Sequence, residues 1–342
     1  MKRSYIVLAI VGIVLLVGGG FWFLYPGQML TKNTELPAYT KVGPTGNIFL
    51  TLQSPSTGTL DIYAYNVTSG ALATMLSNGG HNMTAAFSHD GKMVAFSHRG
   101  GPSLWQIYIA NADGSGSRQI TTDSNRFKRE PVWSYDGRQL AYSVEQENPN
   151  LNPLAPNSWE VYLSDLTNAP VFLGLGIDSF FSPDGRTLYV LQNDGLHAIN
   201  LTKVSMAGNT AGVPLPFPSQ LVESTLVMGS STMASQTMKI SVSPDGTHLA
   251  WSAPTLGLVR IYKITSWAPF IIEPEKDLQV TAYYSAFSPD SQYLALQEVD
   301  LDVNGLPTNA RVVTYHLGDY QPVTKLDLSQ YPVSYVFLTA WQ

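Results

Sequence analysis

The sequence predicts an all-β fold, a six-bladed β-propeller closed by its C-terminal strand and preceded by one N-terminal transmembrane helix. Three observations support this prediction: a turn motif that recurs every 45 to 61 residues, a matching series of short strands, and one long apolar segment at the N-terminus. Repeats of this length that are made of strands are typical of propeller blades. The chain then divides into an anchor at 1–25, a linker at 26–45 and a propeller at 46–342.

The turn motif consists of an apolar residue, Ser, any residue, Asp and Gly, followed by a second apolar strand. Its aspartates lie 46, 48, 61 and 45 residues apart, and they are Asp90, Asp136, Asp184, Asp245 and Asp290. Glycine beside aspartate accepts the positive φ of a tight hairpin turn, so each motif predicts two antiparallel strands. In the last repeat Ser291 replaces the glycine, and we expect that turn to be weaker.

A third strand follows in each repeat, and there are six such strands for five turn motifs. They are 61–65, 106–109, 160–163, 196–199, 260–264 and 311–315. Residues 47–77 hold a second, third and fourth strand without a first, and the chain ends in a lone apolar strand, Val333–Trp341. Pairing these two ends completes a sixth blade and removes the exposed strand edges that favour aggregation.

On these motifs the repeats resemble the PD40, or TolB-type, six-bladed β-propeller, a WD40-like repeat whose blades carry the same Ser-Pro-Asp-Gly turn and an Ile-Tyr third strand. The resemblance covers about residues 46–342. Four positions depart from it: Ser291 replaces the turn glycine, His89 and Tyr135 replace the proline, and His197 stands where tyrosine is usual. TolB itself has an additional N-terminal α/β domain and is soluble, whereas this chain has an apolar segment and a short linker.

The apolar segment runs from Tyr5 to Tyr25 without a charged residue. A membrane span needs about 20 such residues, whereas the apolar region of a cleaved signal peptide has roughly 7 to 15. We therefore predict an uncleaved single-pass anchor, with a cleaved signal peptide as the alternative. Lys2 and Arg3 on its short side place the N-terminus in the cytoplasm and the propeller outside it, in the periplasm or at the cell surface. The linker contains three prolines and is predicted to be a semi-extended spacer.

Composition excludes several classes of protein. The 342 residues include no cysteine, which rules out a disulfide scaffold, a thiolate zinc site and a cysteine nucleophile. The formal net charge is −6, and it is −8 without Lys2 and Arg3. Nucleic acid and anionic lipid surfaces are therefore poor partners.

Loop length separates the two faces of the predicted propeller. The Asp-Gly turns are minimal, whereas the connections between second and third strands on the opposite face are long. These connections are Arg99–Trp105, Glu145–Ser158, Ala253–Leu258 and Val299–Asn309, and a further long segment spans 217–237. Long loops on a rigid scaffold commonly bind partners, although neutral drift of surface loops gives the same pattern.

Asp300, Asp302 and Asn304 alternate like the first oxygen ligands of a calcium loop, and Gly305 follows them. The twelfth position is Arg311 instead of the glutamate that completes such a loop. The segment is thus a candidate calcium site, with a hydrogen-bonded turn as the alternative.

Two groups of residues are candidates for contact with a partner. Arg126, Lys128 and Arg129 form a basic cluster suited to an acidic partner or a lipid headgroup, with a solvated loop as the alternative. Trp105 and Trp159, expected to be exposed, suit glycan or cell-wall binding.

The sequence offers little for catalysis. Its six histidines show no metal-ligand spacing, and it has no Gly-x-Ser-x-Gly nucleophile motif. We therefore predict a propeller without catalytic activity or cofactor that serves as a protein-interaction or scaffold module in an envelope or membrane complex. Two alternatives are a calcium-dependent hydrolase or lactonase-like enzyme with its site at the central channel, and a glycan-binding or cell-wall-binding protein.

Overall fold

A computed structural model describes residues 43–342 except 102–103, 123–124, 148–157, 193–194, 205–218 and 224–238. Residues from Pro44 to Gln342 form one compact unit. The predicted anchor at 1–25 and all but the last three residues of the predicted linker at 26–45 lie outside the described residues. Within the described ranges, no helix has both the length and the apolar character needed to cross a membrane.

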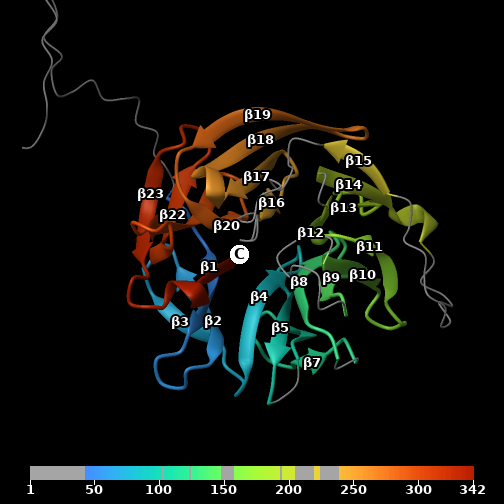
Figure 1. Cartoon of the computed structure of the whole chain (residues 1–342), viewed down its shortest axis with the longest axis horizontal. Helices are drawn as coiled ribbons and strands as arrows, with labels where there is room; N and C mark the ends of the chain where they lie inside the picture. Colours follow the sequence, from blue (N-terminus) through green and yellow to red (C-terminus); the bar gives the residue numbers. More distant parts are fainter. Residues whose placement is uncertain are drawn as a thin grey trace, which may run out of the picture. The chain divides into compact units, whose positions relative to one another are not determined.

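The described residues form six four-stranded antiparallel sheets arranged in a ring around a central channel (Figure 1). Blade 1 has the strand order β24-β1-β2-β3, and blades 2 to 6 are β4 to β7, β8 to β11, β12 to β15, β16 to β19 and β20 to β23. The six-bladed propeller predicted from the repeats is confirmed.

Each blade contributes one strand to each of four concentric layers. The innermost strands are β24 (Phe337–Trp341), β4 (His81–Phe87), β8 (Lys128–Trp133), β12 (Ile177–Phe181), β16 (Ile240–Val242) and β20 (Ala282–Phe287). The second strands are β1 (Asn47–Gln53), β5 (Met93–Arg99), β9 (Leu140–Glu145), β13 (Thr187–Gln192), β17 (His248–Ala253) and β21 (Tyr293–Leu301).

The third strands are β2 (Leu60–Asn66), β6 (Gln106–Asn111), β10 (Trp159–Ser164), β14 (Gly195–Asn200), β18 (Leu258–Trp267) and β22 (Pro307–His316). The outermost are β3 (Leu72–Leu76), β7 (Arg118–Gln119), β11 (Val171–Leu175), β15 (Ser219–Glu223), β19 (Phe270–Leu278) and β23 (Pro322–Asp327). Short 3-10 helices are η2 (Leu201–Lys203), η3 (Pro254–Leu256) and η4 (Val333–Tyr335).

The ring closes where the two ends of the propeller meet in blade 1. Ile48 of β1 pairs with Trp341 of β24, and the Trp341 indole Nε1 donates to Thr45 O at 2.9 Å. The predicted closure is therefore confirmed, but the predicted start of the last strand is wrong. Residues Val333–Tyr335 form η4 after Pro332, and the strand begins only at Phe337.

The repeated serine and aspartate hold each turn between a first and a second strand. In all five repeats the serine Oγ donates to the aspartate Oδ1 at 2.6 or 2.7 Å. Ser291 takes the glycine position with φ of +56°, and its Oγ accepts from the backbone N–H of Asp245 at 3.1 Å. This bond links the turns of two neighbouring blades, so it offsets the strain we expected at Ser291.

Apolar side chains fill all six boundaries between neighbouring blades. One buried residue from each boundary, beginning between blades 6 and 1, is Leu50, Phe96, Tyr142, Val161, Tyr262 and Phe287. Because each blade buries both faces against its neighbours, the ring holds the innermost strands at fixed positions around the channel. We call the side with the Ser-x-Asp-Gly turns the turn face and the opposite side the loop face.

Candidate functional site

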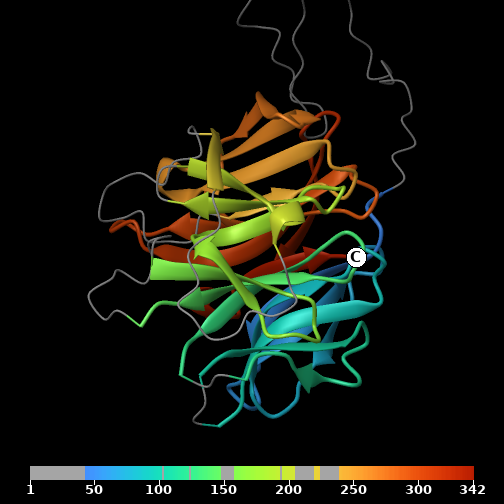
Figure 2. The ribbon, with the colours of Figure 1, turned by 90° about the vertical axis from the view of Figure 1, so that its right-hand side faces the viewer.

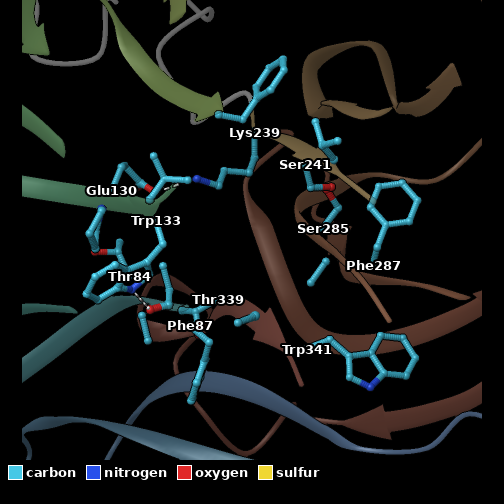
Figure 3. Close-up of a pocket in the computed structure, with 18 of the residues that line it drawn as sticks. Thr84, Phe87, Glu130, Trp133, Lys239, Ser241, Ser285, Phe287, Thr339 and Trp341 are labelled. Atoms are coloured by element: carbon cyan, nitrogen blue, oxygen red, sulfur yellow. Dashed lines mark hydrogen bonds and ion pairs between the residues drawn. The ribbon is translucent and has the colours of Figure 1, made fainter. Parts of the chain in front are cut away.

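The innermost strands of all six blades line a cavity of about 260 Å³ in the central channel (Figure 3). At the turn face it is lined by His89, Tyr135, Pro244 and Gln342. Farther in, it reaches a group of charged side chains. The cavity therefore follows the channel from the turn face to a charged inner end.

One repeat position supplies most of this inner end. The residue six places before each turn aspartate lines the cavity in all five repeats, and these residues are Thr84, Glu130, Asp178, Lys239 and Tyr284. Thr84, Glu130 and Asp178 have positive φ of 52°, 52° and 53°, at irregularities in the pairing of the inner strands. Such bulges redirect side chains, and positive φ in a residue other than glycine is typical of functional positions.

Glu130, Asp178, Lys239 and Arg129 form an ionic quartet. Lys239 Nζ lies 2.8 Å from Glu130 Oε2 and 2.7 Å from Asp178 Oδ1. Arg129 Nη2 lies 2.9 Å from Glu130 Oε1, and Asp178 Oδ2 accepts from the backbone N–H of Ile240 at 2.6 Å. Figure 3 shows the Lys239 side chain extended toward Glu130. Two positive and two negative charges thus balance within the quartet.

The surroundings of the quartet shift the pKa values of its members. Burial alone raises the pKa of Glu130, but the charges of Lys239 and Arg129 lower it to about 2. Burial raises the pKa of Asp178, and Lys239 offsets part of this effect. Burial lowers the pKa of Lys239, but the two carboxylates raise it above its usual value. Glu130 is consequently a poor proton donor or acceptor near neutral pH.

The structure corrects our alternative for the basic cluster, because these residues do not form a solvated loop. Lys128 and Arg129 belong to β8, and Lys128 is buried with its Nζ donating to Arg126 O at 2.9 Å. Arg126 forms an ion pair with Glu160, and its Nε donates to Glu145 O at 2.8 Å. A role in contacting a partner stays a prediction for this cluster. Glu130 and Asp178 both lie six residues before a turn aspartate, so an alignment of the repeats would have shown that they occupy equivalent positions in neighbouring blades.

The expectation that Trp159 is exposed is wrong. This side chain is 1% exposed, because it packs against Phe127, with ring centroids 5.6 Å apart, and under the guanidinium of Arg129. Trp105 is half-buried, with the Arg99 guanidinium 5.8 Å from its ring centroid. Of the two tryptophans, only Trp105 therefore remains a candidate for glycan binding.

The candidate calcium residues belong to the hairpin of β21 and β22. Asp300 Oδ1 accepts from Arg311 Nη1 at 2.6 Å, and Arg311 Nε donates to the buried Glu298 at 2.9 Å. Asp302 Oδ1 accepts from the backbone N–H groups of Asn304 and Leu306 at 2.8 Å. This arrangement favours the hydrogen-bonded turn, and the calcium site stays a prediction. In the part of the chain that the structure describes, no three His, Asp or Glu side chains form a group suited to a metal ion.

Exposed apolar side chains gather on the loop face. Eight large apolar side chains are exposed among the described residues, and seven of them lie on connections of the loop face or on the strand ends beside them. These seven are Leu104, Leu175, Leu256, Leu301, Val303, Leu306 and Tyr335. The eighth, Ile271, lies near the start of β19, toward the turn face.

Three of the seven exposed side chains lie on one hairpin. Leu301 is the last residue of β21, and Val303 and Leu306 lie in the loop before β22, where Val303 is fully exposed. This hairpin extends from the body of the propeller on the side opposite the chain end (Figure 2, left). Single exposed apolar residues are common on protein surfaces, whereas contiguous apolar patches mark interaction sites, and these three side chains lie close together in the chain. The amino-acid composition does not reveal these exposed apolar side chains as a group, because their grouping depends on which loops lie on the same face.

Neither a protein-family model nor a curated protein matches the sequence. Solved structures match the fold. TolB from Acinetobacter baumannii has a TM-score of 0.60 and 18% identity, over 86% of this chain and 66% of that chain. A putative TolB from Agrobacterium tumefaciens has a TM-score of 0.51 and 13% identity, over 83% of this chain and 90% of that one.

The propeller in a nidogen/laminin complex has a TM-score of 0.56 and 10% identity, over 87% of this chain and 97% of that one. This chain thus spans 66% of the length of the Acinetobacter TolB. At these identities the likeness concerns the fold. The comparisons and the strand order together show that residues 44–342 have the six-bladed propeller fold found in TolB-type proteins.

Proposed function

We propose that this protein is a membrane-anchored, extracytoplasmic propeller that binds a protein partner through its loop face and serves as an interaction or scaffold module in an envelope or membrane complex. The observation that carries the proposal is that, among the residues the structure describes, seven of the eight exposed large apolar side chains lie on that face. Burying apolar surface is the main driving force of protein association. The net charge of −6 argues against an anionic lipid surface or nucleic acid as the partner.

Within the ionic quartet, Glu130 is poorly suited to acid–base catalysis. Catalytic acids and bases commonly have pKa values near the working pH. Glu130, with its pKa lowered to about 2, is instead held as a permanent anion by Lys239 and Arg129. We infer that the ion pairs of Lys239 with Glu130 and Asp178 fix the relative positions of the inner strands.

The experiment that tests the interaction role is copurification from mild detergent of the full-length protein and a variant with Leu301→Ser, Val303→Ser and Leu306→Ser. Because the three side chains are exposed, their replacement should leave folding unchanged, which circular dichroism checks. We expect the partner to be lost from the triple variant. The matched control is Ile271→Ser, which removes an exposed apolar side chain near the turn face and should retain the partner. Retention of every partner by the triple variant would contradict the proposal.

The anchor is a separate part of the proposal and rests on the apolar segment Tyr5–Tyr25. Its test is fractionation of cells that produce the full-length chain or a chain lacking residues 1–25, followed by protease treatment of intact cells or spheroplasts. We expect the full-length protein in the membrane fraction and digested from outside the cytoplasm. Recovery of the full-length protein in the soluble fraction, or its protection from external protease, would contradict this part alone.

A further inference from the structure

The channel cavity carries an inference that is independent of the loop face. We propose that it binds a small, uncharged molecule that has an apolar body and one hydrogen-bond-accepting group at its inner end. The cavity volume of about 260 Å³ is close to the lower end of small-ligand pockets, at about 300 Å³, and far above the space that one water molecule needs. A molecule of about ten non-hydrogen atoms is therefore of suitable size.

The apolar body is indicated by a second repeat position. The residue four places before each turn aspartate lines the cavity in all five repeats, and these residues are Ala86, Val132, Phe180, Ser241 and Ala286. Four of the five are apolar, and two of these are alanines. Ala340 of β24 supplies a further small side chain in blade 1. Ala286, Ala340 and Ala86 belong to the consecutive blades 6, 1 and 2, so their small side chains leave space on that side of the channel.

The accepting group is indicated by Lys239. Its ammonium has three protons, and Glu130 and Asp178 accept two of them. The Lys239 side chain lines the cavity and is 23% exposed, so the third proton is available to a ligand. Two residues after Lys239, the hydroxyl of Ser241 lies 2.7 Å from that of Ser285, and one of their two protons is left to donate (Figure 3).

The balance of charge argues for an uncharged ligand. Glu130 and Asp178 together neutralise Arg129 and Lys239. An ammonium group entering the cavity would approach the Lys239 ammonium, and a carboxylate would approach the two carboxylates that already surround it. A charged ligand of either sign would lose its hydration in the cavity, and every opposite charge there is already paired within the quartet. One hydrogen bond does not offset the cost of that lost hydration. An amide, ketone or alcohol avoids it.

The test uses three probes of about the same size and shape: phenylacetamide, phenylacetate and phenethylamine. Binding to the purified protein is measured by ligand-observed NMR titration. For a probe of about ten atoms we expect a Kd near the millimolar range for phenylacetamide. Both charged probes should bind at least about tenfold more weakly, because the quartet offers no free counter-charge.

Two variants locate the binding. Ala86→Leu and Ala340→Leu each fill the cavity from a different blade. If one of the two variants fails to fold, the binding measured with the other still tests the proposal. We expect at least a tenfold loss of phenylacetamide binding in each, whereas Ala73→Leu on the exposed outer strand β3 should have no effect. Three results would overturn the inference: no binding by phenylacetamide, equal binding by a charged probe, or unchanged binding in a folded cavity-filling variant.

Discussion

The ammonium of Lys239 lies 2.8 Å from the carboxylate of Glu130, although Glu130 belongs to blade 3 and Lys239 leads into blade 5. The same ammonium contacts Asp178 of blade 4 at 2.7 Å. One side chain thus connects three successive blades at the wall of the channel. Like the Ser241–Ser285 hydrogen bond between blades 5 and 6, this contact adds a polar restraint to the apolar packing between blades, where the ring has its smallest radius.

Replacing Lys239 with methionine should destabilise the propeller strongly. The change leaves the buried carboxylates of Glu130 and Asp178 without their shared cation, and removal of one partner from a buried ion pair costs about 3 to 5 kcal/mol. Urea unfolding measures the loss. Lys263→Met, which removes an exposed lysine from β18, is the matched control and should change the free energy of unfolding by less than about 0.5 kcal/mol. A loss of unfolding free energy in Lys239→Met as small as that in Lys263→Met would show that the quartet adds no stability.

Replacing Trp341 with alanine should open the closure of the ring. The side chain is buried between blades 6 and 1, and its indole donates to Thr45 O. A buried tryptophan replaced by alanine costs about 3 to 5 kcal/mol of unfolding free energy. Trp105→Ala, which truncates a half-buried tryptophan outside the closure, should cost less than half as much in the same denaturant titration. If the two losses were equal, β24 would not be decisive for closing the propeller.

Acid should unfold the propeller because its carboxylates are held ionised. Hydrogen bonds from Ser88 and the backbone N–H of Lys92 lower the pKa of Asp90 to about 2, and serine hydroxyls also lower the pKa values of Asp136 and Asp184. A folded pKa below the unfolded value stabilises the fold above about pH 4 and loses this effect as the pH falls toward 2. Glu130 acts in the same direction, whereas Asp178, whose pKa is raised, opposes it.

The free energy of unfolding should therefore decrease steadily from pH 5 to pH 2 in urea titrations. Ser88→Ala removes the hydroxyl that donates to Asp90, so its pH dependence should be shallower than that of the unchanged protein. A steeper dependence in this variant, or stability that is constant over this range, would contradict the assignment of the turn aspartates.

The sequence predicted the architecture because local rules determine it. The Ser-x-Asp-Gly turns and the alternation of the strands depend on residues close together in the chain, and the unmatched strand Val333–Trp341 left only one way to complete the ring. The first four residues of that segment were misassigned, because Pro332 and the turn that follows it interrupt the strand pattern.

The sites were harder to predict because they depend on distant residues. Lys239 and Glu130 are 109 positions apart, and nothing in either neighbourhood shows that they meet. Trp159 appeared exposed because its burial depends on Phe127 and Arg129 of a different strand. The long connections predicted for the loop face are partly wrong, because β21 extends to Leu301 and β22 starts at Pro307, so the connection predicted at Val299–Asn309 is only 302–306. Which side chains this face exposes became clear only from the structure.

Calcium should leave the thermal unfolding of the protein unchanged. Arg311 is already paired with Asp300 and with the buried Glu298. Both N–H groups that bind Asp302 come from its own turn, so a cation would have to displace these contacts. Differential scanning fluorimetry with millimolar calcium, and with magnesium as control, measures the effect. A ligand at one hundred times its Kd stabilises by about 2.7 kcal/mol, a shift that this method readily detects. A rise in Tm with calcium alone would contradict this prediction and establish that the protein binds calcium.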